Sequence, residues 1–236
     1  MTQAYSRGPS IYQGGRGTLY IIIACVAVFF LQTLFPQLTT QWLSLIPALA
    51  LRGQVWRLVS YMFMHGDFAH IFFNMLGLFF FGPVLEKTFG HKRFLQFYFI
   101  CGVGAGVVSV LFYYGLGQAD AHIIGASGAI FGVLAAYGIL FPNSTVYLNF
   151  ILPVKAKWLV LIYGSMELIA TFKYAGGGRS GIASIAHVSG MVIAYFYIRG
   201  MFDGKRLWLR YKYWRADRER KKRFKVIDGD QNRTLH

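Results

Sequence analysis

Uninterrupted apolar segments constrain the fold of this chain more than any other feature. No Asp, Glu, Lys or Arg occurs in residues 17–51, 68–85 or 121–154. A helix of about 20 apolar residues crosses a hydrocarbon core roughly 30 Å thick, so runs of this kind are typical of membrane spans. Hydrophobic residues make up 56% of the chain and charged residues only 14%, which excludes a water-soluble domain of this size. The sequence predicts an integral membrane protein.

The apolar segments predict an all-α fold, a polytopic membrane bundle of six transmembrane helices. The predicted spans are Leu19–Phe35, Phe68–Leu85, Phe94–Tyr114, Gly125–Phe141, Trp158–Phe172 and Ile182–Ile198. The connection between the first two spans, about 32 residues, is too long and too apolar for an unstructured loop in water. We expect this long loop to lie in the outer membrane interface.

Basic residues predict the orientation of the bundle. With six spans, all but four of the 24 Lys and Arg side chains fall on one side of the membrane. The positive-inside rule then places both termini in the cytoplasm. We expect residues 1–18 to form a cytoplasmic N-terminal segment, residues 19–202 the six-helix membrane domain and residues 203–236 a basic cytoplasmic tail.

The tail combines basic and aromatic side chains, as in "RLWLRYKYWR". Next to a membrane span, this composition favours contact with anionic lipid headgroups, with a solvated tail as the alternative. Basic residues among aromatics also occur on nucleic-acid surfaces, but we expect no nucleic-acid partner here.

Four polar side chains are predicted to converge at one depth in the outer leaflet. His70 and Asn74 are four residues apart on the second span and share a helix face, Ser127 lies in the first turn of the fourth, and His187 lies in the sixth. All three spans run inward. Each residue alone has an ordinary explanation, either close packing or an interhelical hydrogen bond. Their common depth instead favours a water-filled cavity lined by all four.

These residue types fit nucleophilic catalysis. A serine hydroxyl is a weak nucleophile until a base takes its proton, and histidine is suited to that role near neutral pH. An acyl-transfer intermediate also needs donors for its oxyanion, which the Ser127 backbone N–H, His70 and Asn74 would supply. Because no acid is obviously placed to orient His187, the sequence predicts a Ser127–His187 dyad.

Other polar and ligating residues receive structural interpretations. Glu167 should lie deeper than Ser127, so we expect a structural hydrogen bond there, with a role in admitting substrate as the alternative. Cys25 and Cys101 are expected to be buried apolar residues. The histidines lack the spacing of a zinc site, and we expect neither a metal nor a cofactor.

Small residues provide a reason for two helices to pack closely. Gly128 and Gly132 form a small-residue face on the fourth span, and Gly190 and Ala194 follow His187 on its own side of the sixth. Close approach of these two backbones would bring Ser127 to His187. The packing motif would then position the nucleophile.

Taken together, the motifs resemble the rhomboid family of intramembrane serine proteases. The stretches "WR", "HIFFN", "GASG" and "AHVSG" occur in the family's order, and the likeness covers about residues 40 to 200. The resemblance implies Ser127 as nucleophile, His187 as general base and then acid, and His70 with Asn74 as oxyanion donors. It also implies that Trp56 and Arg57 hold the outer loop.

The implied function is that of an intramembrane serine endopeptidase without a cofactor. Its substrates would be single-span membrane proteins, cut within or near the outer leaflet. The absence of a seventh span resembles the bacterial six-span form, so we expect a multi-pass protein of the bacterial cytoplasmic (inner) membrane. Ala194 departs from a glycine often found there, and Phe131, where some relatives have Tyr, would stack on His187 or simply pack. The alternative is a non-catalytic rhomboid-like protein that binds client transmembrane helices.

Overall fold

The structure, a computed structural model, describes residues 15–148, 151–174, 179–200 and 215. Its elements, in chain order, are α1 (Arg16–Leu34), α2 (Pro36–Leu43), α3 (Pro47–Leu51), α4 (Arg57–Ser60), the 3-10 turn η1 (Tyr61–Phe63), α5 (Phe68–Phe89), α6 (His91–Gly115), α7 (Ser127–Leu140), β1 (Thr145–Leu148), β2 (Leu152–Lys155), α8 (Ala156–Tyr174) and α9 (Arg179–Ile198). The two strands form one antiparallel hairpin. Apart from Arg215, the predicted tail of residues 203–236 lies outside the described residues.

Several helices have the length and composition of membrane spans. Among the described residues, α1, α5 and α6 are long and apolar enough to cross a bilayer, while α7 and the Ser184–Ile198 part of α9 are shorter apolar helices. The mainly helical membrane bundle agrees with the predicted fold class. The number of spans stays a prediction.

The ends of the helices differ from the predicted spans by up to four residues, and two of these differences have a plain reason. The fourth span was expected from Gly125, but α7 begins at Ser127, because Gly125 has a φ of +123° that no helix accommodates. The sixth was expected from Ile182, but α9 begins at Arg179. Hydropathy marks the apolar part of a span, whereas a helix can continue into its polar end.

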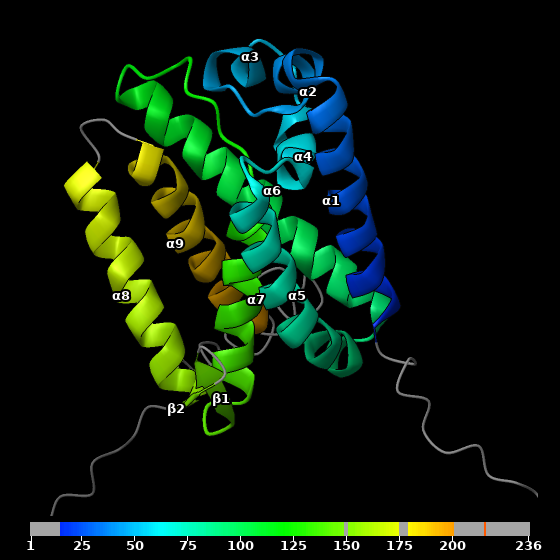
Figure 1. Cartoon of the computed structure of the whole chain (residues 1–236). Coiled ribbons are helices and arrows are strands. Elements are labelled where there is room, and N and C mark those ends of the chain that lie inside the picture. The colour runs from blue at the N-terminus through cyan, green and yellow to red at the C-terminus, as the bar shows by residue number, and fades with distance from the viewer. Residues whose placement is uncertain (1–14, 149–150, 175–178, 201–214, 216–236) are drawn as a thin grey trace, which may run out of the picture. The chain divides into compact units, whose positions relative to one another are not determined.

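The long loop is folded into short helices. α2 and α3 each begin with a proline at the first helical position, where the missing N–H has no cost. Both lie at one end of the bundle, and the β1–β2 hairpin lies at the other (Figure 1). The prediction that this connection has structure of its own is confirmed.

Arg57 holds this folded loop together. Its guanidinium is buried and donates three hydrogen bonds of 2.6 Å, to the Gln54 side chain and to the backbone carbonyls of Ser44 and Gln41. The neighbouring Trp56 donates its indole N–H to the Trp42 carbonyl at 3.1 Å. These bonds satisfy backbone groups that the short helices leave without partners.

The bundle is organised around α5 and α6. α5 packs against α1, α6 and α7, and α6 packs in turn against α7. The side chains of Phe94, Phe97 and Tyr98 on α6 are fully buried. α7 contacts α5, α6 and α8, and eight of its 14 residues are buried, so it lies inside the bundle.

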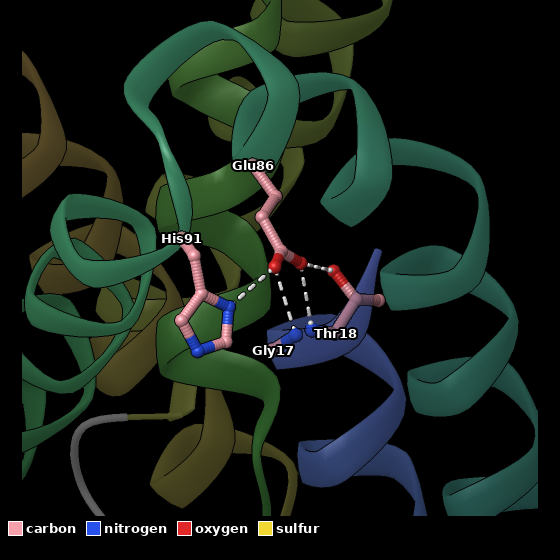
Figure 2. A network of polar contacts seen from close by, with 4 residues as sticks. All are labelled: Gly17, Thr18, Glu86 and His91. Carbon is pink, nitrogen blue, oxygen red and sulfur yellow. Dashed lines mark hydrogen bonds and ion pairs between the residues drawn. The ribbon is translucent and has the colours of Figure 1, made fainter. Parts of the chain in front are cut away.

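A carboxylate from α5 caps the start of α1. The N-cap residue Gly15 has no side chain to bond the first-turn N–H groups. Glu86, about 70 residues later, accepts hydrogen bonds from the backbone N–H groups of Gly17 and Thr18 and from the Thr18 hydroxyl, and it pairs with His91 at 2.7 Å (Figure 2). Because Glu86 is buried, this network joins α1 to the α5–α6 turn.

We expect Glu86→Ala to lower the free energy of unfolding by about 2–5 kcal/mol, because two backbone N–H groups of α1 lose their acceptor. Reversible unfolding in lipid bicelles, followed by tryptophan fluorescence, measures this change. Thr88→Ala is the matched control, since Thr88 is exposed and bonds only within its own helix. Equal unfolding free energies for the two variants would contradict the capping role.

Candidate active site

Ser127 is the first residue of α7, and the backbone before it explains why. A Cβ built on Gly125 would lie 2.8 Å from His70 Nε2 and 3.6 Å from Ser127 Oγ. Both the positive φ and this contact therefore require glycine at position 125. No side chain caps α7, so N–H groups of its first turn have no partner within the helix. The Ser127 hydroxyl lies beside these unpaired donors.

The structure brings Ser127 and His187 into direct contact. The distance from Ser127 Oγ to His187 Nε2 is 2.7 Å, that of a hydrogen bond. The two residues are 60 positions apart in the sequence and belong to α7 and α9. Only close packing of these helices can produce this contact.

Glycines permit that packing. A Cβ at Gly190 would overlap the carbonyl oxygen of Gly128, and one at Gly132 would lie 3.1 Å from the carbonyl oxygen of Gly190. On the α6 side of α7, a Cβ at Gly128 would lie 2.9 Å from the Ala105 Cβ. α7 therefore has no room for side chains at Gly128 and Gly132, where backbone approaches backbone.

Phe131 stacks on the His187 ring. The ring centroids are 4.2 Å apart and the planes are only 10° from parallel. Of the two alternatives considered for Phe131, stacking is the one observed. This contact fixes the plane of the imidazole, so that Nε2 stays directed at Ser127.

The surroundings of His70 define which of its nitrogens carries the proton. Asp67 caps α5 by accepting the His70 backbone N–H at 2.7 Å, and the Gly66 N–H donates to His70 Nδ1 at 3.2 Å. Because Nδ1 accepts a hydrogen bond, the proton of the neutral ring is on Nε2. This N–H borders the same space as the Ser127 hydroxyl.

Asn74 lies one turn further along α5 and is 8% exposed. Within the described part of the chain, its Nδ2 has no hydrogen-bond partner. Burying an amide donor without an acceptor is unfavourable, so a ligand or a water molecule is needed to accept its hydrogen bond. His70 and Asn74 thus offer two N–H donors from one face of α5.

Glu167 corrects the sequence analysis. We expected it to lie too deep to reach His187, yet Glu167 Oε2 is 3.1 Å from His187 Nδ1. His187 Nδ1 has no hydrogen-bond partner in the described ranges, so the contact is a close approach of the carboxylate to the ring nitrogen. Counting along apolar segments could not reveal this contact, because it depends on how α8 is rotated about its own axis relative to α9.

His65 is a site residue that sequence reasoning missed. It is buried, donates from Nδ1 to the Phe63 carbonyl at 3.2 Å, and meets His70 edge-on at a centroid distance of 5.1 Å. Burial, with the nearby His70 adding to it, lowers the pKa of His65 to about 4, so this ring is neutral at pH 7. His65 precedes α5 and His70 lies in its first turn, so the helical periodicity of the sequence did not relate the two residues.

No group of three His, Cys, Asp or Glu side chains in the described part of the chain is arranged to hold a metal ion. The polar side chains of this site come from α5, α7, α8 and α9.

Comparison with known proteins gives the family. Residues 52–204 match the model of the Rhomboid domain. The chain is 30% identical over 194 residues to Rhomboid protease AarA of Providencia stuartii, which covers 75% of this chain and 69% of that protein. It is 34% identical over 145 residues to RHOMBOID-like protein 5 of Arabidopsis thaliana, which covers 61% of this chain and 43% of the relative. The chain thus spans less than half the length of the plant relative.

The fold and the match define an integral membrane protein built as a helix bundle. The chain belongs to the rhomboid family. The resemblance inferred from the motifs is confirmed. The relative from Providencia stuartii is named a protease.

Gly190→Ala tests the helix contact that assembles the site. The added methyl group would overlap the Gly128 carbonyl, and overpacking of this kind costs about 1–3 kcal/mol. We expect the Tm in detergent to fall by about 2–12 °C.

Gly164→Ala on α8 is the control, because a Cβ there lies 3.5 Å from Met191, an ordinary van der Waals distance. It should leave the Tm unchanged or slightly raise it, since alanine favours helix. A Gly190→Ala protein that melts with the control would mean that α7 and α9 do not pack through these glycines.

Proposed function

We propose that this protein is an intramembrane serine endopeptidase in which Ser127 is the nucleophile and His187 the general base. The 2.7 Å contact between Ser127 Oγ and His187 Nε2 is the observation that carries the proposal. It joins a hydroxyl to the one kind of side chain that accepts a proton readily near neutral pH. Membership of a family with a named protease relative supports it.

In the proposed reaction, Ser127 Oγ attacks the carbonyl carbon of a peptide bond while its proton passes to His187 Nε2. The resulting tetrahedral intermediate collapses, the C–N bond breaks, and the proton on Nε2 passes to the leaving nitrogen. Water then attacks the acyl carbon with His187 again as base. The carboxylic acid product leaves and the Ser127 hydroxyl is restored.

The oxyanion of the intermediate would be bound by N–H donors near Ser127. His70 Nε2–H, the unpartnered Asn74 amide and the Ser127 backbone N–H are the proposed donors. Fixed donors stabilise developing charge without reorganising, which is where most of their catalytic effect arises. Gly128, Gly132 and Gly190 would position the nucleophile, while Trp56 and Arg57 support the folded outer loop.

Substrates are proposed to be single-span membrane proteins, cut within or near the outer leaflet. The distribution of basic residues supports an orientation with both termini in the cytoplasm. The bacterial inner membrane is proposed from the resemblance to the six-span bacterial form. The proposed organisation keeps residues 19–202 as the six-helix domain and residues 203–236 as a basic tail, with anionic lipid as its partner.

The test compares the native chain with Ser127→Ala and His187→Ala. We expect a fluorophosphonate to form one adduct on the native protein, at Ser127, and none on either variant. Co-expression with a panel of single-span membrane proteins should give shorter products only with the native chain. A protein that binds client helices without cleaving them would instead show neither adduct nor product, while still retaining those helices on purification.

Asn74→Ala measures the proposed oxyanion site. Removing one such donor costs about 2.7–4 kcal/mol of transition-state stabilisation, so kcat/KM for a cleaved substrate should fall about 10²–10³-fold. Thr88→Ala, an exposed position on the same helix, should leave kcat/KM unchanged. Full activity in Asn74→Ala would remove this amide from the mechanism.

A further inference from the structure

The second nitrogen of His187 faces a carboxylate that the proposed mechanism does not use. Glu167 on α8 lies with Oε2 at 3.1 Å from His187 Nδ1, and both side chains are largely buried, at 20% and 12% exposure. Nδ1 has no hydrogen-bond partner in the described ranges, so Glu167 is the polar group nearest to completing it. The contact joins α8 to α9 beside the Ser127 hydroxyl.

Glu167 lies on a different side of α8 from its exposed apolar neighbours. Its neighbours Met166, Leu168 and Ile169 are 59%, 46% and 66% exposed on the apolar outside of the helix. A carboxylate on that surface would be costly in lipid, whereas Glu167 lies on the opposite, inward side. The side of α8 on which Glu167 lies therefore keeps its carboxylate beside the imidazole.

Every edge of the imidazole that matters for proton transfer is then occupied. Ser127 contacts Nε2, Phe131 covers one face of the ring, and Glu167 lies at Nδ1. Among the described residues, His70 also interacts electrostatically with His187. Since His70 Nδ1 is bonded to Gly66, it does not compete for His187 Nδ1.

Resting on the proposed function, we propose that Glu167 is a positioning residue that completes a Ser127–His187–Glu167 triad. The carboxylate keeps the proton of the neutral imidazole on Nδ1, which leaves Nε2 free to take the Ser127 proton. After the transfer, both ring nitrogens carry protons, and the positive charge lies beside the Glu167 carboxylate. In a partly buried site this attraction is stronger than in water. Glu167 itself stays ionised, and no proton passes to it.

The Nδ1–H of His187 makes no aligned hydrogen bond to the Glu167 carboxylate, and this is compatible with the proposed role. Catalytic hydrogen bonds are often poorly aligned without substrate and tighten when the charge develops. Glu167 has three rotatable side-chain bonds, and its carboxylate is already within ion-pair distance. Rotation about these bonds can adjust the position of the carboxylate relative to Nδ1.

The experiment uses the reaction of the full-length protein with a fluorophosphonate, which needs no knowledge of the natural substrate. Ser127 Oγ forms a bond to phosphorus, fluoride leaves with the bonding electrons, and the serine proton passes to His187 Nε2. We expect Glu167→Gln, which keeps the shape but removes the charge, to lower kinact about 10²-fold while KI changes less than about threefold. Glu167→Asp keeps the charge on a shorter side chain. Its kinact should be at least about tenfold higher than that of Glu167→Gln.

Thr171→Val is the matched control, because Thr171 is buried one turn further along α8 and bonds only to the Glu167 backbone carbonyl. It should keep native kinact. If Glu167→Gln does not melt cooperatively in detergent, Glu167→Met replaces it as the neutral variant suited to a membrane helix. A folded neutral variant with native kinact, or an Asp variant no faster than the neutral one, overturns the triad. Ser127→Ala distinguishes failure of the triad from failure of the protease proposal. If only the triad fails, the native chain is labelled and Ser127→Ala is not. If the protease proposal fails, Ser127→Ala labels like the native chain.

Discussion

The approach of α7 to α9 at Gly128 and Gly190 is the contact on which the rest of the site depends. Lipid tails are as apolar as the helices they surround, so no hydrophobic effect drives two spans together in a bilayer. Association rests on how closely the backbones can pack, and here a Cβ at Gly190 would already overlap the Gly128 carbonyl. Only at that separation can a short serine side chain on one helix reach an imidazole on the other at 2.7 Å.

Local backbone chemistry then converts this packing into a reactive arrangement. Gly125 turns the chain with a positive φ, so that α7 starts at Ser127 and its unpaired N–H groups lie beside the hydroxyl. Across the same space, a hydrogen bond from Gly66 sets the tautomer of His70. Ser127, His187 and the side chains of His70 and Asn74 are positioned by different segments, and each depends on hydrogen bonds or packing outside the site.

Sequence reasoning could address the parts of the site that depend on position along the helices. A helix rises about 1.5 Å per residue, so counting from the ends of apolar runs predicted a common level for Ser127, His187, His70 and Asn74. The structure brings the first three together. Glu167 could not be found this way, because its contact depends on the rotation of α8 about its own axis. The tautomer of His70 and the carbonyl bonds of Arg57 were likewise invisible, since both involve backbone groups that carry no sequence signal.

An experimental structure of the protein phosphonylated at Ser127 tests the central claim most directly. If α7, α9 and α5 together form one preorganised site, the phosphoryl oxygen will lie within hydrogen-bond distance of His70 Nε2 and Asn74 Nδ2, with His187 Nε2 still beside Ser127 Oγ. A phosphoryl oxygen directed away from both donors, or a His187 ring turned from Ser127 in a folded protein, would contradict the account.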